Sequence, residues 1–368
     1  MRPRSFAELP AEVERLLADH ARVVLVYFDA FGWRFAERHS DHPLLAQARV
    51  ERWTSQFPST TTVHTTTIHT GLPVADHGLY EWHCYEPRLN RLITPLWFCF
   101  AGENTRDTLL AAGVEPRDVF PFEPLYRRLP VPSHVAMPGG IAGSLPSRRL
   151  LGGATVHRFR DAAEGLARLA AAVAAEERAY GLAYLPEADA RMHAVGPDAP
   201  EVAAAIDRTL SALRASRWPA GTLVLLTSDH GMAAISPERT TYLNVVWPEL
   251  GGHLAAGADG RPLAPAGSAR DLFLHVLPER LDEVAARLAA LLEGKAAVRR
   301  VDDLLAEGLF GRAPSDALRA RLANLVVLPG AGEAVWWLDP PRFEQRFRGQ
   351  HGGLSADEME IPLASWVA

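Results

Sequence analysis

Residues Arg22–Phe28 read RVVLVYF, and the acid Asp29 follows directly. The run is apolar after its first residue and contains three valines, which is typical of a strand buried on both faces of a sheet. Because sites in open parallel sheets form at the carboxyl ends of strands, an acid in this place is a candidate site residue. Two later apolar runs are also followed by an acid: GLAYL (Gly181–Leu185) by Asp189, and TLVLLT (Thr222–Thr227) by Asp229.

Helical patterns alternate with these strands. Amphipathic or well-capped stretches predict helices at Phe6–Asp19, Thr60–Thr70, Asp161–Tyr180 and Pro200–Ser216. Alternation of buried strands with helices predicts an α/β fold, with a doubly wound, mostly parallel sheet and helices on both faces.

Two regions depart from this alternation. Residues Tyr85–Leu150 are rich in proline and glycine and predict a long excursion with short elements. The second region is expected to be a small inserted α+β subdomain, residues 236–343, within a core formed by 1–235 and 344–368. Its predicted elements are a strand at Asp271–Val276, a helix at Leu281–Glu293, a short strand at Val298–Val301, and a hairpin of Leu325–Leu328 with Ala334–Leu338.

Composition excludes several classes of protein. The chain has 368 residues, 48% of them hydrophobic and 22% charged, as in a globular protein. A net charge of −6 without a basic run predicts no binding to a nucleic-acid duplex. Cys84 and Cys99 match no zinc-finger spacing and are expected to be free thiols. Met1–Leu17 lacks the apolar run of a signal peptide, so we expect no membrane segment and a cytoplasmic location.

Acids and imidazoles recur near the predicted strand ends. His230 follows Asp229 at once, His193 lies four residues after Asp189, and His351 lies in a glycine-rich turn. Each feature alone also suits a helix cap, a surface pair or an exposed histidine. Together they form a mixed oxygen and nitrogen donor set that suits Zn²⁺, or Mn²⁺ or another divalent ion.

A hydroxyl-rich run, FPSTTTVHTTTIHTG (Phe57–Gly71), lies between the first two groups of acids. It leads into the predicted helix Thr60–Thr70, whose N-terminus would attract an anionic phosphate. A threonine activated by a metal can attack phosphorus, although a simple hydroxyl-rich helix cap is the alternative. The combination predicts metal-assisted hydrolysis of a phosphate ester.

The order of these segments resembles the alkaline phosphatase superfamily, most closely its type I phosphodiesterase/nucleotide pyrophosphatase branch. The matching segments are an aspartate after a strand, FPSTT…TG with HG soon after, YLPEADARMHAVGP, SDHGM and HGG. The resemblance covers Val23–Gly78, Gly181–Met232 and Gly349–Pro362. It implies two zinc sites, one formed by Asp29, Asp229 and His230, the other by Asp189, His193 and His351. It also implies Thr61 as the nucleophile, with Thr60 as the second choice.

Departures from the family pattern concern the substrate. Ala30 stands where the family usually has glycine, and Glu81 and Trp82 lie near the place where many of its phosphodiesterases carry an asparagine that holds a phosphate oxygen. Trp82 and Phe31 are candidate substrate-binding residues, with ordinary core aromatics as the alternative for both.

The resemblance implies a hydrolase of the phosphodiesterase/nucleotide pyrophosphatase type that acts through a phosphothreonine intermediate and a two-zinc centre. Its substrate would be a small-molecule phosphate ester, with a nucleotide as one candidate. Two alternatives remain: a phosphomonoesterase of the same superfamily, and a catalytically silent relative that binds phosphorylated ligands. The Cys-x-Pro-Ser-Arg signature of sulfatases is missing. The oligomeric state is left open.

Overall fold

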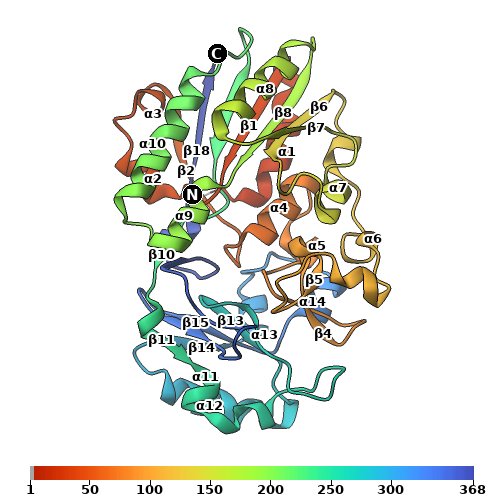
Figure 1. The fold of residues 1–368 in the computed structure, drawn as a ribbon, viewed down its shortest axis with the longest axis vertical. Helices are drawn as coiled ribbons and strands as arrows, with labels where there is room; N and C mark the ends of the chain where they lie inside the picture. Colours follow the sequence, from red (N-terminus) through yellow and green to blue (C-terminus); the bar gives the residue numbers. More distant parts are fainter. Residues whose placement is uncertain (1–3) are drawn as a thin grey trace.

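A seven-stranded sheet forms the centre of the upper lobe in Figure 1. The computed structural model describes residues 4–368. Met1–Pro3 belong to the predicted core 1–235 and to the N-terminal segment Met1–Leu17, and they lie outside the described residues. The strand order is β2-β18-β9-β1-β8-β6-β7, and only β18 runs antiparallel to its neighbours. The fold class predicted from the sequence is therefore confirmed. The strands are β1 (Arg22–Phe28), β2 (Arg49–Thr54), β6 (Ser133–Pro138), β7 (Thr155–Phe159), β8 (Ala179–Leu185), β9 (Leu223–Thr227) and β18 (Glu360–Val367).

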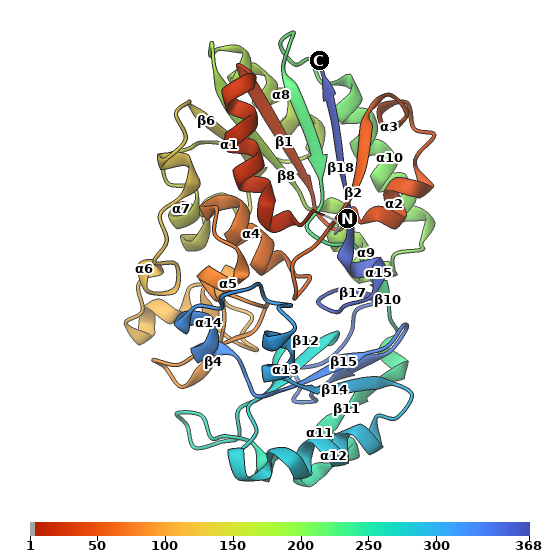
Figure 2. The same cartoon turned by 180° about the vertical axis from the view of Figure 1, so that it is seen from behind.

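Helices cover both faces of this sheet because successive side chains of β1 point to opposite sides. Its even-numbered residues pack with α8 (Ala162–Ala174) and α10 (Pro200–Ala215). Its odd-numbered residues pack with α1 (Leu9–Asp19) and α4 (Thr61–Thr70). Figures 1 and 2 show these two helix layers from opposite sides. The other helices of this lobe are η1 (Phe6–Glu8), α2 (Trp33–Arg38), α3 (Pro43–Gln47), η4 (Leu125–Arg127), α7 (Leu145–Leu150), α9 (Glu187–Val195) and α15 (Ala356–Met359).

The predicted helix Asp161–Tyr180 is wrong at its carboxyl end. Asp161 caps α8 as expected, because its carboxylate accepts a hydrogen bond from the backbone N–H of Glu164 at 2.9 Å. The helix ends at Ala174, and Ala179 already begins β8, where it pairs with Arg22 of β1. Pairing within the sheet thus overrides the helical preference of this alanine-rich segment.

The excursion Tyr85–Leu150 contains the predicted short elements and also an unforeseen strand, β6, which belongs to the central sheet. A small sheet of β3, β4 and β5 precedes it. Cys84 and Cys99, in β3 and β5, are buried free thiols, as predicted. The helix α5 (Val74–His77) precedes the excursion. Its short elements are β3 (Cys84–Glu86), β4 (Arg91–Thr94), η2 (Pro95–Trp97), β5 (Cys99–Phe100), η3 (Thr108–Ala112) and α6 (Pro116–Val119).

The lower lobe begins where the chain leaves the upper lobe at β10 (Ala233–Ala234) and ends where it returns at β17 (Gly349–Gln350), which pairs with β10. Its main sheet has the order β12-β13-β15-β14. The elements between these points are η5 (Pro237–Arg239), β11 (Thr240–Tyr242), α11 (Leu243–Val246), η6 (Pro248–His253), β12 (Ala266–Ser268), β13 (Asp271–Leu274), η7 (Pro278–Arg280), α12 (Leu281–Leu291), β14 (Ala296–Arg300), α13 (Val301–Ala306), α14 (Asp316–Arg321), β15 (Leu325–Pro329) and β16 (Ala334–Trp336).

The predicted hairpin of Leu325–Leu328 with Ala334–Leu338 is wrong. The first segment, β15, pairs with β13 and β14, whereas the second, β16, runs parallel to β11 in a separate two-stranded sheet. Both segments are apolar because each is buried in the lobe, so adjacency in sequence was a poor guide to pairing. The lobe's core also includes Tyr80 and Leu92 from outside the insertion, and the boundaries 236–343 stay a prediction.

Within residues 4–368, no helix has both the length and the apolar character that crossing a membrane requires.

A buried ion pair connects the two lobes. Arg270, in the turn between β12 and β13, donates from Nε and Nη2 to the carboxylate of Glu358 in α15, at 3.0 and 2.9 Å. Its Nη1 donates to the carbonyl oxygens of Gly330 and Glu333. The side chains of the pair are 1% and 0% exposed, so each charge depends on the other for compensation.

Replacing Glu358 with glutamine is expected to lower the free energy of unfolding by about 3 kcal/mol or more, because Arg270 then keeps an uncompensated buried charge. Urea unfolding measures the change. The matched control is Glu283→Gln, which breaks a half-exposed pair with Arg280 and should cost less than about 1 kcal/mol. Equal effects of the two substitutions would contradict this account of the lobe interface.

Candidate active site

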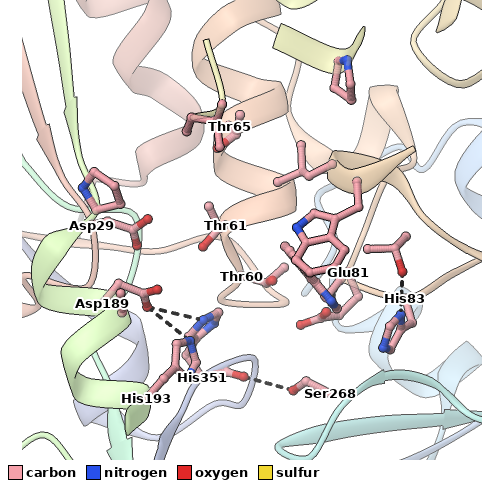
Figure 3. A pocket seen from close by; sticks show the side chains of 18 of the residues that line it. Asp29, Thr60, Thr61, Thr65, Glu81, His83, Asp189, His193, Ser268 and His351 are labelled. Atoms are coloured by element: carbon pink, nitrogen blue, oxygen red, sulfur yellow. Dashed lines mark hydrogen bonds and ion pairs between the residues drawn. The ribbon is translucent and has the colours of Figure 1, made fainter. Parts of the chain in front are cut away.

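Three aspartates meet at the carboxyl edge of the central sheet. Two of them, Asp29 and Asp189, line a cavity shared by the two lobes and are seen in Figure 3. Asp29 follows β1, Asp229 follows β9, and Asp189 lies in α9, which begins two residues after β8. Neighbouring parallel strands end at the same edge, which brings together residues that are far apart in sequence. Asp29 and Asp229 are 1% and 0% exposed.

The first cluster contains Asp29, Asp229 and His230, the set expected from the sequence. His230 Nε2 lies 3.0 Å from Asp229 Oδ2 and 3.7 Å from Asp29 Oδ1. Each residue offers one ligand atom, and these atoms all lie within 4.8 Å of one another. All three residues are buried, so the group has the size and donors of a metal site.

The second cluster surrounds Asp189. Nε2 of His193 and Nε2 of His351 lie 3.4 and 3.7 Å from Asp189 Oδ1. The tightest group here joins Asp189 and His351 with His230, whose ring stacks on His351 at a centroid distance of 3.7 Å. His230 therefore faces both clusters, and the assignment of His193 as the third ligand stays a prediction.

The three imidazoles are oriented in the same way. Their Nδ1 atoms lie 2.8–3.0 Å from backbone carbonyl oxygens: His230 next to Gly231, His193 next to Gly349, and His351 next to Ser59. Because a carbonyl oxygen only accepts, each Nδ1 carries the proton. Each Nε2 then points toward the carboxylates, and this is how proteins hold histidines that bind a metal.

Crowded charges shift the pKa values of these groups. Burial, together with the charges of Asp229 and Asp189, raises the pKa of Asp29 well above its usual range. Burial alone would lower the pKa of His230, but the adjacent Asp229 and Asp29 raise it to about 10. The same imidazolium outweighs burial at Asp229 and lowers its pKa. Burial lowers the pKa of His351.

The residues fit a divalent cation. Asp29 Oδ1 and Asp189 Oδ1 are buried atoms without a hydrogen-bond partner, and an acceptor in that state needs a cation or a proton. Both oxygens lie beside imidazole Nε2 atoms. Carboxylate oxygen and imidazole nitrogen are donors that suit Zn²⁺ and Mn²⁺.

Two tight backbone positions shape this edge. A side chain on Gly231 would come within 2.0 Å of the carbonyl oxygen of Asp357, so glycine is needed here for close approach rather than for an unusual turn. Ala30 adopts a left-handed conformation with φ of 60°, which explains why glycine would suit this place. Its N–H donates to Asp229 Oδ1 at 3.2 Å and thereby ties β1 to the first cluster.

The threonine hydroxyl groups of the run Phe57–Gly71 have different surroundings in the structure. Thr61 is the first residue of α4, lines the cavity and has its Oγ1 3.2 Å from His230 Nε2. Thr60 is the N-cap residue of α4, but its side chain makes no capping hydrogen bond; it also lines the cavity and is 1% exposed. Thr66 and Thr70 donate to carbonyl oxygens one turn earlier and serve the helix itself. Thr61 is thus the hydroxyl in contact with the predicted metal ligands.

A cavity of about 660 Å³ opens in front of these residues and is lined by both lobes. Trp82 lines the cavity. The ring of Trp82 packs edge-on against the ring of Trp97, with a centroid distance of 6.0 Å. The prediction that Phe31 binds substrate is wrong. Phe31 is fully buried and stacks on Phe28 with a distance of 4.9 Å between ring centroids. The left-handed turn at Ala30 directs the chain back, so Phe31 joins the core between the sheet and α2.

Sequence reasoning missed two tyrosines that hold the carboxylates. The hydroxyl of Tyr27 donates to Asp229 Oδ2 at 2.8 Å, and the hydroxyl of Tyr184 donates to Asp29 Oδ2. Tyr27 lies two residues before Asp29 and Tyr184 two residues before Pro186, where strand alternation could have revealed them. His64 was also missed: its Nδ1–H donates to the carbonyl of Thr60 at 2.7 Å and fixes the start of α4.

The fold and the clustered ligands define an α/β protein with a candidate metal centre at the edge of a mostly parallel sheet. A family model described as type I phosphodiesterase/nucleotide pyrophosphatase matches residues 23–353. The chain belongs to this family, which is a family of hydrolases, and the likeness seen in the sequence is confirmed.

Solved structures give the same fold. Murine ectonucleotide pyrophosphatase/phosphodiesterase 5, in an inactive threonine-to-alanine variant in complex with AMP, matches with a TM-score of 0.66 and 20% identity. The murine protein without that substitution and its human counterpart each match with a TM-score of 0.65, at 21% and 20% identity. Each match covers 93% of this chain and 87% of the other. Comparison with curated protein sequences yields no match.

The metal-free protein is expected to lose stability as the pH rises from about 7 to about 9.5, by about 1 kcal/mol per pH unit. Folding raises the pKa of His230 from 6.5 to about 10, so the folded state holds a proton that the unfolded chain releases at lower pH. That stabilisation is complete below the pKa that His230 has in the unfolded chain. It is lost as the pH approaches the pKa of His230 in the folded protein. Urea unfolding in a chelator measures the effect.

His230→Gln is the control, because it removes one titrating group and should make this dependence less steep. Metal-free wild type that is equally stable at both ends of the range would contradict the electrostatic account of the site.

Proposed function

We propose that the protein hydrolyses phosphate diesters or nucleotide pyrophosphates through Thr61 and a two-zinc centre. The observation that carries the proposal is the position of Thr61 Oγ1, 3.2 Å from His230 Nε2, the imidazole that faces both ligand clusters. A hydroxyl among six metal-ligand candidates at a helix N-terminus has the surroundings of an activated nucleophile. Family membership supports the same reaction class.

In the proposed reaction the Thr61 oxygen attacks phosphorus in line with the leaving group. The P–O bond to the leaving group breaks, and a phosphothreonine forms that keeps the substrate's second ester group on phosphorus. Water then attacks this phosphoryl group on the opposite side and regenerates the threonine. The N-terminal backbone N–H groups of α4 point toward the phosphate and stabilise its negative charge. Divalent ions held by the two clusters would supply Lewis-acid stabilisation of the attacking and leaving oxygens.

Ligand roles follow from the two clusters. Asp29, Asp229 and His230 would hold one ion, and Asp189, His193 and His351 the other. Tyr27 and Tyr184 would keep the carboxylates oriented through their hydroxyl hydrogen bonds. Three protein ligands for each ion leave a position for substrate, as catalytic sites require.

A nucleotide is the substrate class with most support. The murine relative was solved with AMP, and the cavity of this chain carries Trp82 and Trp97, whose indole rings offer flat apolar surfaces to a base. The cavity volume of about 660 Å³ suits a small-molecule ligand of this size.

Thr61→Ala is expected to lower kcat/KM for aryl phosphate diesters and nucleotide pyrophosphates by at least about a thousandfold, because it removes the nucleophile. Acid-quenched wild type should carry on Thr61 a phosphoryl group that still bears the substrate's remaining ester group, detected by peptide mass spectrometry. Thr62→Ala is the matched control: this hydroxyl does not line the cavity, and activity should persist.

Unchanged turnover in Thr61→Ala would contradict the proposal. Loss of turnover in Thr60→Ala alone would transfer the role to the second-choice threonine. Wild type that binds AMP but hydrolyses none of these esters would support the catalytically silent relative.

A further inference from the structure

One face of α4 borders the cavity beyond Thr61. Thr61, Thr65 and His69 follow one another at four-residue spacing, so they lie on the same face of the helix. All three line the cavity, and Figure 3 shows Thr65 one turn along α4 from Thr61. At a rise of 1.5 Å per residue, the distance along the helix from Thr61 to His69 is about 12 Å. The cavity therefore has an arm that runs from the candidate nucleophile along α4.

Other segments of the upper lobe complete this arm. The helix α7 contacts both α4 and η2, and it begins just after the end of β6. The residues that these segments add to the lining are partly apolar and partly hydroxyl-bearing: Trp97, Met137, Ile141, Ser144, Ser147 and Leu150. The arm thus offers apolar surface together with polar groups, which suits a flat ring with polar edges better than a plain hydrocarbon chain.

His69 is the polar residue of this arm that lies farthest from Thr61 along α4. It is 2% exposed, and its Nδ1 lies 2.6 Å from the hydroxyl oxygen of Tyr126 in η4. Within residues 4–368 its Nε2 forms no hydrogen bond, although the residue lines the cavity. Burial lowers the pKa of His69 to about 3, so the imidazole is neutral near pH 7. A buried polar atom in this state needs a partner from a ligand or from water.

A neutral imidazole in this place can pair with a donor or with an acceptor. The hydroxyl of Tyr126 can donate to Nδ1 of His69 or accept from it, so Nε2 carries a lone pair in one case and a proton in the other. Thr65 adds a hydroxyl group to the arm. The hydroxyls of Thr66 and Thr70 donate to backbone carbonyls of α4, whereas that of Thr65 forms no hydrogen bond within the described part of the chain.

In-line attack determines which part of the substrate enters the arm. The proposed leaving group departs on the side of phosphorus opposite Thr61, and therefore away from α4. The arm runs along α4 itself, beside the reacting phosphorus. It therefore faces the ester group that stays on phosphorus when the leaving group departs.

We propose that the arm along α4 binds the nucleoside of a nucleotide substrate, and that His69 Nε2 hydrogen-bonds with the edge of its base. The inference rests on the proposed function, since it assigns the ester group that Thr61 retains. The span of about 12 Å from Thr61 to His69 is of the order of an extended nucleotide, from its phosphorus to the far edge of its base. A hydrocarbon group in the same place would leave Nε2 buried without a partner, which is unfavourable. His69 is thus a specificity-determining residue.

The test compares two esters with the same leaving group: the p-nitrophenyl ester of thymidine 5′-monophosphate, and methyl p-nitrophenyl phosphate, whose methyl group is too short to reach His69. The variant His69→Asn keeps a polar atom near Tyr126, in the place of Nδ1, and removes Nε2. It should lower kcat/KM for the nucleotide ester by about tenfold or more, mainly through KM, because the base loses its buried partner. Hydrolysis of the methyl ester should stay within about twofold of wild type, which also shows that the variant is folded.

Two further variants separate recognition from packing. His69→Gln places an amide near the position of Nε2 and should recover part of the loss. His77→Asn is the matched control: His77 is equally buried, and burial lowers its pKa to about 3, but it does not line the cavity. Its ratio of kcat/KM for the nucleotide ester to that for the methyl ester should equal the wild-type ratio. An unchanged ratio in His69→Asn, or an equal fall in His77→Asn, overturns the inference.

A second measurement needs no variant. AMP should inhibit hydrolysis of the methyl ester by wild type at least about tenfold more strongly than ribose 5-phosphate, which lacks the base. Equal inhibition by the two compounds overturns the inference. Wild type that cleaves neither ester would instead overturn the proposed function.

Discussion

The structure depends on the repulsion among three carboxylates, Asp29, Asp189 and Asp229, held at one sheet edge. Asp29 and Asp229 are almost completely buried. Their surroundings raise the pKa of Asp29 and lower the pKa of Asp229. Like charges at this spacing are tolerated inside a protein only when positive charge compensates them. In this chain the compensation comes from His230, or from cations bound where its Nε2 and the free carboxylate oxygens point.

Much of the upper lobe serves to hold that arrangement. Strands β1, β8 and β9 are adjacent and parallel, so the residues at their ends converge. Hydroxyl groups of Tyr27 and Tyr184 fix the carboxylates, and backbone carbonyls fix the imidazoles. These contacts restrict motion of the ligands before any ion binds, which is the preorganisation that a metal centre requires.

The lower lobe completes the cavity. Ser268 donates to the carbonyl oxygen of His351 at 2.9 Å, so the insertion contacts a candidate metal ligand. The buried pair Arg270–Glu358 holds the same turn against the upper lobe. The two lobes therefore contribute different parts of one site: the candidate metal ligands and Thr61 come from the upper lobe, and part of the wall comes from the lower.

The sequence was informative where one local pattern decides the structure. Long apolar runs before Asp29 and Asp229 predicted buried strands, and the four-residue spacing of Asp189 and His193 suits their place on one helix, α9. It was uninformative where the structure depends on distant partners. Short, partly exposed strands such as β2 and β7 form only against neighbours, and the turn at Ala30 sends Phe31 away from the cavity. Nothing near Glu358 in sequence indicates Arg270, 88 residues earlier, as its partner.

The central claim is that the two clusters hold two metal ions around Thr61. Crystals of the protein loaded with zinc, measured at the zinc absorption edge, test it directly. The account predicts two anomalous peaks, one between Asp29, Asp229 and His230 and one between Asp189, His193 and His351, with Thr61 beside both. A single peak, or peaks remote from these residues, would contradict it.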